Sequence, residues 1–346
     1  MANCTRCKSY SSSSQTGSGQ ADWQSALADA VRNPAELCRL LNLDLALASE
    51  AAAASGEFSL LVPRDYLSRI RPGDPTDPLL LEILPQAAET AAVPGFETDP
   101  LGEGEAVCGS GLLQKYQGRL LIVASRACSV HCRYCFRRHF PYDILPSDGE
   151  FSTFTSAFQE IAADRSIHEV ILSGGDPLTL PDEKLTEIIV ELAKIPHLRR
   201  VRIHSRMPVM IPHRVNDDFV STLRGSRLTS VMVVQVNHPA EINEAVAVAF
   251  GRLIDGGVPV LNQSVLLRGV NDRVDVLAEL FERLIDLRVI PYYLHQLDAV
   301  AGAAHFEVPV AAGVALMAEL RVRLPGYAVP RYVRETRNEM SKMLLE

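Results

Sequence analysis

The chain has 346 residues, 47% of them hydrophobic and 22% charged, with a formal net charge of −8. This composition is that of a globular protein with a packed core and argues against a disordered chain, and the negative charge argues against nucleic acid as the main partner. No apolar run approaches the length of a membrane span and no secretion leader is visible at the N-terminus, so we expect a cytoplasmic protein that does not enter a membrane.

The first 105 residues fall into two parts that differ in amino-acid composition. Residues 1–20 are polar and rich in serine, which predicts a disordered tail; they include Cys4 and Cys7, a pair that could bind a metal but has no second pair nearby. Residues 21–105 are expected to form a mainly helical accessory region that wraps around the rest of the chain. Asn33-Pro34 is a helix-start signal, and the proline-rich stretch from 58 to 100 predicts short helices joined by extended pieces.

From residue 106 to 325 apolar runs alternate with helical patterns. Continuous runs of Val, Ile and Leu are typical of buried parallel strands, and their alternation with helices predicts right-handed crossovers. The six β-like runs lie at 120–125, 169–173, 200–204, 231–236, 258–267 and 289–294. The helical patterns lie near 151–165, 181–195, 216–224, 240–255, 272–287 and 310–324. Six units are too few for a closed eight-stranded barrel, so we expect an α/β fold with an open partial (β/α)6 barrel. Its functional side chains should lie at the C-terminal ends of the strands.

Three cysteines follow the first of these runs at the spacing C-x3-C-x2-C: Cys128, Cys132 and Cys135. Thiolates hold iron–sulfur clusters, and a cubane normally takes four of them, so three ligands leave one iron open to a substrate. Zinc is the competing interpretation because His131 and His139 are near, and a structural trio of buried thiols is a third. Seven cysteines in all, three of them clustered, favour a reducing compartment and a metal site over disulfides.

The other β-like runs also end in polar residues. Buried strands have little use for such residues unless a ligand pairs with them, and the carboxyl ends of parallel strands share one edge. The residues concerned include Ser173-Gly-Gly-Asp176, His204, Gln235, Gln263, His295 and Asp298. Their convergence predicts a binding site beside the cysteines.

The cysteine spacing, placed after a strand and followed by an aromatic residue, is the signature of radical S-adenosylmethionine enzymes. Further motifs make the chain resemble the lysine 2,3-aminomutases, which also use pyridoxal phosphate. These motifs are Arg137-Arg138, Ser173-Gly-Gly-Asp176, Arg206-Met-Pro-Val209, Asn237-His-Pro239, the run 262–271, Pro291-Tyr-Tyr293 and the run 326–330. The resemblance implies a radical S-adenosylmethionine barrel over 106–325, a short pyridoxal phosphate-binding tail over 326–346, and three cofactors: a 4Fe–4S cluster, S-adenosylmethionine and pyridoxal phosphate.

The resemblance also implies a role for individual residues. Cys128, Cys132 and Cys135 would hold the cluster, and Arg137 would pair with the substrate carboxylate, which its planar fork suits. Asp298 and Glu335 would hold the far amino group of lysine. Lys342, which by pattern alone is a solvated tail charge, would form the covalent link to pyridoxal phosphate. The remaining residues expected to bind cofactors are Ser173, Gly174, Gly175, Asp176, Gln263, Tyr116 and Arg119.

Within the family, the segments 135–142, 294–295 and 303–306 resemble the short branch that serves elongation factor P. This implies conversion of L-lysine to (R)-β-lysine, which a partner ligase attaches to the factor, with an electron donor such as flavodoxin or ferredoxin. Two features depart from the family: the run 337–341 before Lys342 lacks glycines, and Gln235 stands where relatives carry histidine. The alternatives are a free-lysine or other amino-acid aminomutase, a radical S-adenosylmethionine enzyme without pyridoxal phosphate, and a simple iron–sulfur carrier or zinc-binding module.

Overall fold

A sheet of ten strands, paired in sequence order from β1 to β10, organises the chain in the computed structural model. The structure describes residues 19–56, 58–109, 111–142, 152–337 and 339–346, so the predicted tail through residue 18, with Cys4 and Cys7, lies outside the described residues. The seven parallel strands are β3 (Arg119–Ser125), β4 (Glu169–Gly174), β5 (Arg200–Ser205), β6 (Thr229–Gln235), β7 (Val260–Leu266), β8 (Ile290–Gln296) and β9 (Arg331–Arg334). The antiparallel strands at the two edges are β1 (Val107–Gly109), β2 (Leu112–Leu113) and β10 (Met343–Leu344).

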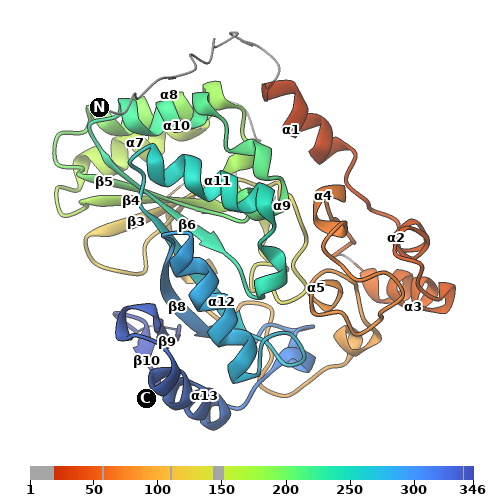
Figure 1. Ribbon diagram of the computed structural model, residues 1–346. Helices are drawn as coiled ribbons and strands as arrows, with labels where there is room; N and C mark the ends of the chain where they lie inside the picture. The colour runs from red at the N-terminus through yellow and green to blue at the C-terminus, as the bar shows by residue number, and fades with distance from the viewer. Residues whose placement is uncertain (1–18, 57, 110, 143–151, 338) are drawn as a thin grey trace, which may run out of the picture.

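Helices cover the outer face of the curved sheet, each following the strand that precedes it in sequence (Figure 1). They are α7 (Ser152–Ala163), α8 (Asp182–Lys194), α10 (Asp217–Gly225), α11 (Glu244–Asp255), α12 (Val274–Asp286) and α13 (Val310–Arg323), with the one-turn α9 (Met207–Met210) after β5. The six predicted β/α units are therefore confirmed, and the fold is an open partial barrel. The seventh parallel strand, β9, and the three edge strands were not predicted.

Five N-terminal helices lie beside the barrel at the right of Figure 1, with α4 against α9. They are α1 (Gly19–Ala28), α2 (Pro34–Leu40), α3 (Leu45–Ser55), α4 (Arg64–Leu67) and α5 (Pro78–Leu81); the short α6 (Glu103–Ala106) leads directly into β1. The predicted helix start is confirmed, because Asn33 Oδ1 accepts hydrogen bonds from the backbone N–H groups of Ala35 and Glu36 ahead of Pro34. The helices over 58–100 are short, as the prolines predict.

Single turns of 3-10 helix punctuate the loops. They are η1 (Ala87–Thr90), η3 (Pro177–Thr179), η4 (Pro212–Arg214), η5 (Pro239–Glu241), η6 (Ala304–Phe306) and η7 (Gly326–Ala328).

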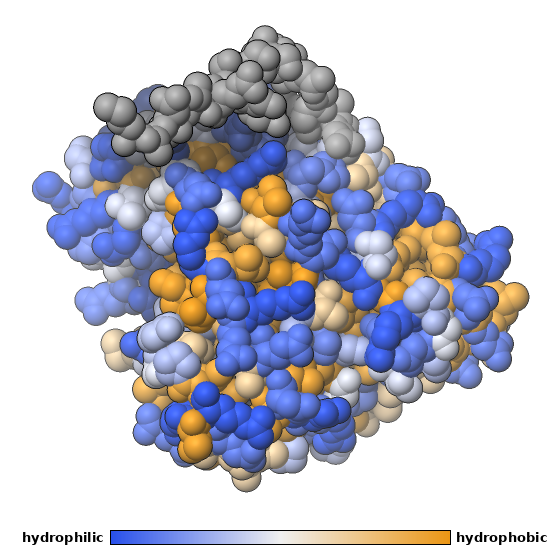
Figure 2. Space-filling view, in the orientation of Figure 1, coloured by the Kyte–Doolittle hydropathy of each residue, from blue (hydrophilic) through white to orange (hydrophobic). Residues whose placement is uncertain are grey.

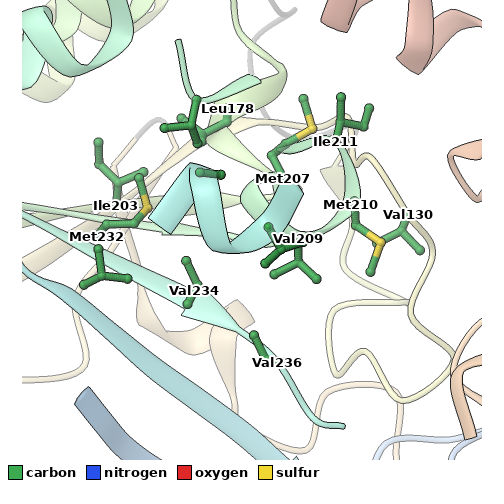
Figure 3. Close-up of a cluster of buried hydrophobic side chains, with 14 of the residues drawn as sticks. Val130, Leu178, Ile203, Met207, Val209, Met210, Ile211, Met232, Val234 and Val236 are labelled. Atoms are coloured by element: carbon green, nitrogen blue, oxygen red, sulfur yellow. The ribbon is translucent and has the colours of Figure 1, made fainter. Parts of the chain in front are cut away.

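The core lies between the sheet and its helices. Val170 and Leu172 of β4 are fully buried, and being two positions apart they share one face of the strand. Figure 3 shows the part of this core where Met207, Val209 and Met210 of α9 pack with apolar side chains of β5 and β6, and Val130 of the cysteine loop belongs to the same cluster. Burying one apolar side chain of this size stabilises the folded state by roughly 1.5–3 kcal/mol. The side chains in this cluster therefore anchor α9 and the cysteine loop to the barrel.

On the face seen in Figure 2, hydrophilic residues predominate and hydrophobic patches are interspersed around the middle of the molecule. Within the described part of the chain, no helix has both the length and the apolar character needed to cross a membrane.

Candidate active site

The barrel encloses a cavity of about 1170 Å³ whose walls come from the cysteine loop, the strands and the C-terminal tail. All the residues to which the family resemblance gave a site role line it. They are Cys128, Cys132, Cys135, Arg137, Ser173, Gly174, Gly175, Asp176, Gln263, Asp298, Glu335, Lys342, Tyr116 and Arg119. The structure thus brings together side chains that are more than 220 positions apart, while their individual roles stay predictions.

The cysteine loop is held from outside by the N-terminal region. Glu89 accepts a bidentate pair of hydrogen bonds from Arg133, at 2.9 and 2.6 Å, and a further one from Arg138 at 2.7 Å. Two backbone hydrogen bonds also connect the loop to the N-terminal region: the N–H of His131 donates to Leu61 O, and the N–H of Arg133 donates to Glu82 O. Arg133 is fully buried, and a buried guanidinium is tolerated only with such partners. The N-terminal region therefore shapes the loop that carries the cysteines.

Gly174 and Gly175 let the base of the cysteine loop lie directly on the end of β4. Gly174 has φ +119°, and a Cβ there would meet Ser125 O at 2.6 Å; a Cβ on Gly175 would meet Ala127 O at 2.3 Å. The N–H groups of Gly175 and Asp176 donate to Ser125 O and Ala127 O. The glycines line the cavity, and this backbone contact already requires that they have no side chain; their predicted contact with a cofactor remains a prediction.

Asp176 is buried, and its carboxylate is used within the protein. It accepts hydrogen bonds from Ser205 Oγ and from the N–H groups of Leu178, Arg206 and Met207. Asp176 thereby fixes the turn between β5 and α9, and its predicted contact with a cofactor remains a prediction.

Arg137 is tied to a partner that the sequence did not reveal. Its Nε and Nη2 atoms each donate to the carboxylate of Glu103 at 2.7 Å, and Nη1 donates to Ser173 Oγ at 3.0 Å. The fork that was expected to be free for a substrate carboxylate is thus largely occupied, because Glu103 takes the Nε–Nη2 edge and Nη1 also donates to Gly174 O at 3.4 Å. Burial would lower the pKa of Arg137, but the Glu103 carboxylate outweighs it and raises that pKa. A substrate carboxylate would have to replace Ser173 Oγ and Gly174 O as the acceptor of the Nη1 hydrogens.

Lys342 reaches the cavity without glycines before it. β10 pairs with β9, Met343 opposite Arg334 and Leu344 opposite Val333, and this hairpin places Lys342 Nζ in hydrogen-bond contact with Glu335 Oε2. Lys115 Nζ donates to the other oxygen of Glu335 at 2.8 Å. Burial would raise the pKa of Glu335, but the Lys342 and Lys115 ammonium groups outweigh it and lower that pKa.

Asp298 is a second acidic side chain in the cavity and, unlike Glu335, has a carboxyl oxygen without a hydrogen-bond partner among the described residues. That oxygen, Oδ1, is also shielded from solvent. Burial, and then the negative charge of Glu335, raise the pKa of Asp298 to about 7. An amine-bearing ligand would supply the missing donor and positive charge.

The cavity continues to the opposite end of the strands, which the sequence did not predict. Arg119 is the first residue of β3 and lies 4.5 Å from the ring of Tyr116, and Arg202 and Arg331 also line the cavity. Inward positions alternate along a strand, and here polar residues such as His204 and His295 line the cavity together with apolar ones such as Ile171. The cavity therefore extends along the length of the barrel interior, and it is lined by residues from both ends of the strands.

These residues fit the expected cofactors. The arginines at the start of the strands suit a phosphate, and the ring Nε2 atoms of His204 and His295 are buried without partners in the described residues. Burial, and then Lys342, lower the pKa of His295 to about 3, so its imidazole is neutral. A bound pyridine-type cofactor would meet Lys342, these imidazoles and the arginines in one cavity.

The three cysteine thiols lie at the other end of the cavity. No group of three or more His, Cys, Asp or Glu side chains in the described part of the chain is arranged to hold one metal ion. Zinc needs four ligands at about 2.0–2.3 Å from one centre, whereas each cysteine of a cubane binds its own iron. Burial raises the pKa of Cys135 to about 12, so a bound cation is what would hold that thiol as a thiolate. The arrangement is not that of a zinc site.

Comparison with known proteins agrees with this geometry. The sequence model of the Radical SAM superfamily matches residues 122–281. A protein of Haemophilus influenzae named L-lysine 2,3-aminomutase is 43% identical over 93% of this chain and 95% of its own length. Proteins of the same name are 44% identical in Escherichia coli, over 94% of both chains, and 36% identical in Clostridium subterminale, over 90% of this chain and 74% of that one. Among solved structures, SuiB of Streptococcus suis bound to precursor peptide SuiA is 13% identical, with a TM-score of 0.46 over 60% of this chain and 46% of that one.

The cysteine loop and the partial barrel define a radical S-adenosylmethionine enzyme. The chain belongs to the lysine 2,3-aminomutase family, whose members are isomerases that use a 4Fe–4S cluster, S-adenosylmethionine and pyridoxal phosphate. The zinc module and the simple electron carrier, considered from the cysteine spacing, are thereby set aside.

Several site residues escaped the sequence reasoning. No motif in the sequence around Glu103 or Lys115 indicates a site residue, because the role of each depends on an ion pair with a residue far along the chain. His204 and His295 were visible as polar strand ends but received no role.

Replacing Glu103 with glutamine should destabilise the protein by about 3 kcal/mol, because it leaves the buried Arg137 charge without its counter-ion. The measurement is the free energy of unfolding by denaturant. The matched control is Glu105→Gln, whose exposed contact with Arg337 at 3.3 Å should be worth no more than about 1 kcal/mol. Equal small losses for both variants would show that Glu103 does not hold Arg137.

Proposed function

We propose that the protein is an L-lysine 2,3-aminomutase that converts L-lysine to (R)-β-lysine. The observation that carries this proposal is the set of charged groups that line the cavity: the Arg137 guanidinium, the Asp298 and Glu335 side chains, and Lys342, which contacts Glu335. Lysine has a matching pattern, a carboxylate at one end and an ammonium at the other. Asp298 Oδ1, which lacks a partner among the described residues, gives that ammonium an acceptor.

The protein residues have positioning roles in this reaction. When bound, the cluster with S-adenosylmethionine supplies a carbon-centred radical, and pyridoxal phosphate supplies a carbonyl for the migrating amino group. Arg137, kept in place by Glu103 and Ser173, binds the carboxylate of the amino acid. Asp298 binds the far ammonium, and Lys342 is the amine that attaches pyridoxal phosphate. The enclosing walls exclude water and oxygen from the reacting atoms.

Glu335 is the second carboxylate that this proposal assigns to the substrate ammonium. It pairs with Lys342 and Lys115 in the described structure. The substrate ammonium would join these two amines at Glu335 and would also face Asp298. Two carboxylates against one arginine select lysine over glutamate, because a second substrate carboxylate would face like charges.

The physiological setting we propose is modification of elongation factor P in the cytoplasm, with β-lysine passed to a partner ligase. The segments 135–142, 294–295 and 303–306 support this branch, as does the higher identity to the Haemophilus influenzae and Escherichia coli relatives than to the Clostridium subterminale one. A small one-electron donor such as flavodoxin or ferredoxin would reduce the cluster. The competing function within the family is the metabolism of free lysine or another amino acid.

The direct test is anaerobic incubation of the reduced holoprotein with L-lysine, S-adenosylmethionine and pyridoxal phosphate. We expect β-lysine with R configuration, and loss of activity by at least about 1000-fold in Lys342→Ala. The control is Lys194→Ala, an exposed lysine at the end of α8, which should retain full activity. An S product would overturn the elongation factor P assignment, and the absence of any β-lysine would overturn the aminomutase itself.

Asp298 makes a pH prediction. Its pKa of about 7 means that it is neutral below pH 7 and ionised above, and only the carboxylate attracts an ammonium. From pH 6 to pH 8 the ionised fraction rises about tenfold, so KM for lysine should fall by about that factor while kcat changes less. Asp298→Asn should raise KM at least about 30-fold and lose this dependence. An unchanged KM–pH profile in Asp298→Asn would contradict the assignment.

A further inference from the structure

Arg206 is a buried arginine directly after β5 that contacts one of the cluster cysteines. Its Nη1 atom donates to Cys132 Sγ at 2.8 Å. Its side chain is 6% exposed, and its guanidinium lies 5.6 Å from the ring of Tyr134, two residues after Cys132. A charged hydrogen-bond donor therefore approaches the sulfur from the protein side.

Two buried carboxylates hold this guanidinium in place. Nη2 donates to Glu82 Oε2 and, at 2.9 Å, to Glu241 Oε2, and both glutamates are fully buried. Asn237 links the group further, since its Nδ2 donates to Glu82 Oε2 at 3.0 Å and to Tyr134 Oη at 2.7 Å. The N–H of Asn237 also donates to Glu241 Oε1 at 2.6 Å. Because Asn237 holds both glutamates and both glutamates hold Arg206, the guanidinium has a fixed orientation.

The backbone of Arg206 is also fixed. Its N–H donates to Asp176 Oδ2 at 2.8 Å, and the α9 turn that it begins is anchored by Met207, Val209 and Met210 in the apolar cluster of Figure 3. An arginine rigid at both ends of its side chain keeps a fixed distance to Cys132. That is the property required of a group that tunes a metal ligand.

We propose that Arg206 is a positioning residue that raises the reduction potential of the cluster through its hydrogen bond to Cys132, while Glu82 opposes it. The reduction potential is that of the redox couple formed by the oxidised and the one-electron-reduced 4Fe–4S cluster. Reduction adds one electron, and no bond is made or broken. That electron increases the negative charge on the sulfur ligands. A nearby cation and N–H donor therefore stabilises the reduced form, and a nearby carboxylate destabilises it. This inference depends on the cluster and not on which amino acid is the substrate.

The alternative is that Arg206 acts only as a structural link between the N-terminal region and the barrel. The two interpretations differ in sign. If Arg206 tunes the cluster, removing its charge and removing the charge of Glu82 must shift the potential in opposite directions. If it is only a link, both changes loosen the same contact and no opposite shifts arise.

The experiment measures the midpoint potential of the cluster in the anaerobically reconstituted full-length protein, without S-adenosylmethionine or lysine. The protein is titrated with dithionite, and electron paramagnetic resonance monitors the reduced cluster at each potential. The titration is done at pH 8, because burial, and then Glu241, raise the pKa of Glu82 to about 7 and the carboxylate is ionised there. Iron and sulfide content are measured first for Arg206→Met, Arg206→Lys and Glu82→Gln. The matched control is Arg214→Lys, a fully buried arginine that pairs with Asp182 at 2.7 Å.

We expect a lower midpoint potential in Arg206→Met, a smaller decrease in Arg206→Lys, a higher potential in Glu82→Gln and no change in the control. Shifts of the same sign in the Arg206 and Glu82 variants, or unchanged potentials at full iron content, would overturn the proposal. If Arg206→Met does not assemble a cluster, Arg206→Lys and Glu82→Gln decide the question by the same criterion. Because no lysine is present, a failure of the aminomutase function leaves this result intact.

Discussion

Buried ion pairs that the N-terminal region makes with the cysteine loop, and with Arg206 after β5, are the interactions on which the rest of the site depends. Glu89 binds Arg133 and Arg138, Glu103 binds Arg137, and Glu82 binds Arg206. A buried charge that loses its partner costs several kcal/mol, so the loop can take its observed path only while residues 58–106 are docked. The accessory region is therefore part of the active site, although few of its side chains line the cavity.

The second constraint is the return of the C-terminal tail to the sheet. β9 extends the parallel sheet beyond β8, and β10 folds back on it, which carries Lys342 to Glu335 and Lys115. The open barrel allows this, because its edges are free to accept further strands. The tail thus closes a cavity that has the cysteines at one end and Arg119 at the other.

The barrel was predictable because its signals are local. Six runs of Val, Ile and Leu predicted β3 to β8, and the cysteine spacing and the family motifs predicted the cavity wall. β9 escaped prediction because Arg331-Tyr-Val-Arg334 is short and carries two arginines, and β10 because it is two residues long. Glu103 and Lys115 escaped because their partners, Arg137 and Glu335, lie 34 and 220 positions away. No periodicity or spacing encodes such contacts, and the same holds for the contact of Arg206 with Cys132.

The central claim is that Cys128, Cys132 and Cys135 leave one iron of the cluster open to S-adenosylmethionine in the cavity that Lys342 also enters. The most direct measurement is electron–nuclear double resonance on the reduced protein with S-adenosylmethionine labelled with ¹⁵N at the amino group and ¹⁷O at the carboxylate. We expect hyperfine coupling of both labels to the cluster. A cluster that shows coupling to neither label would contradict the claim.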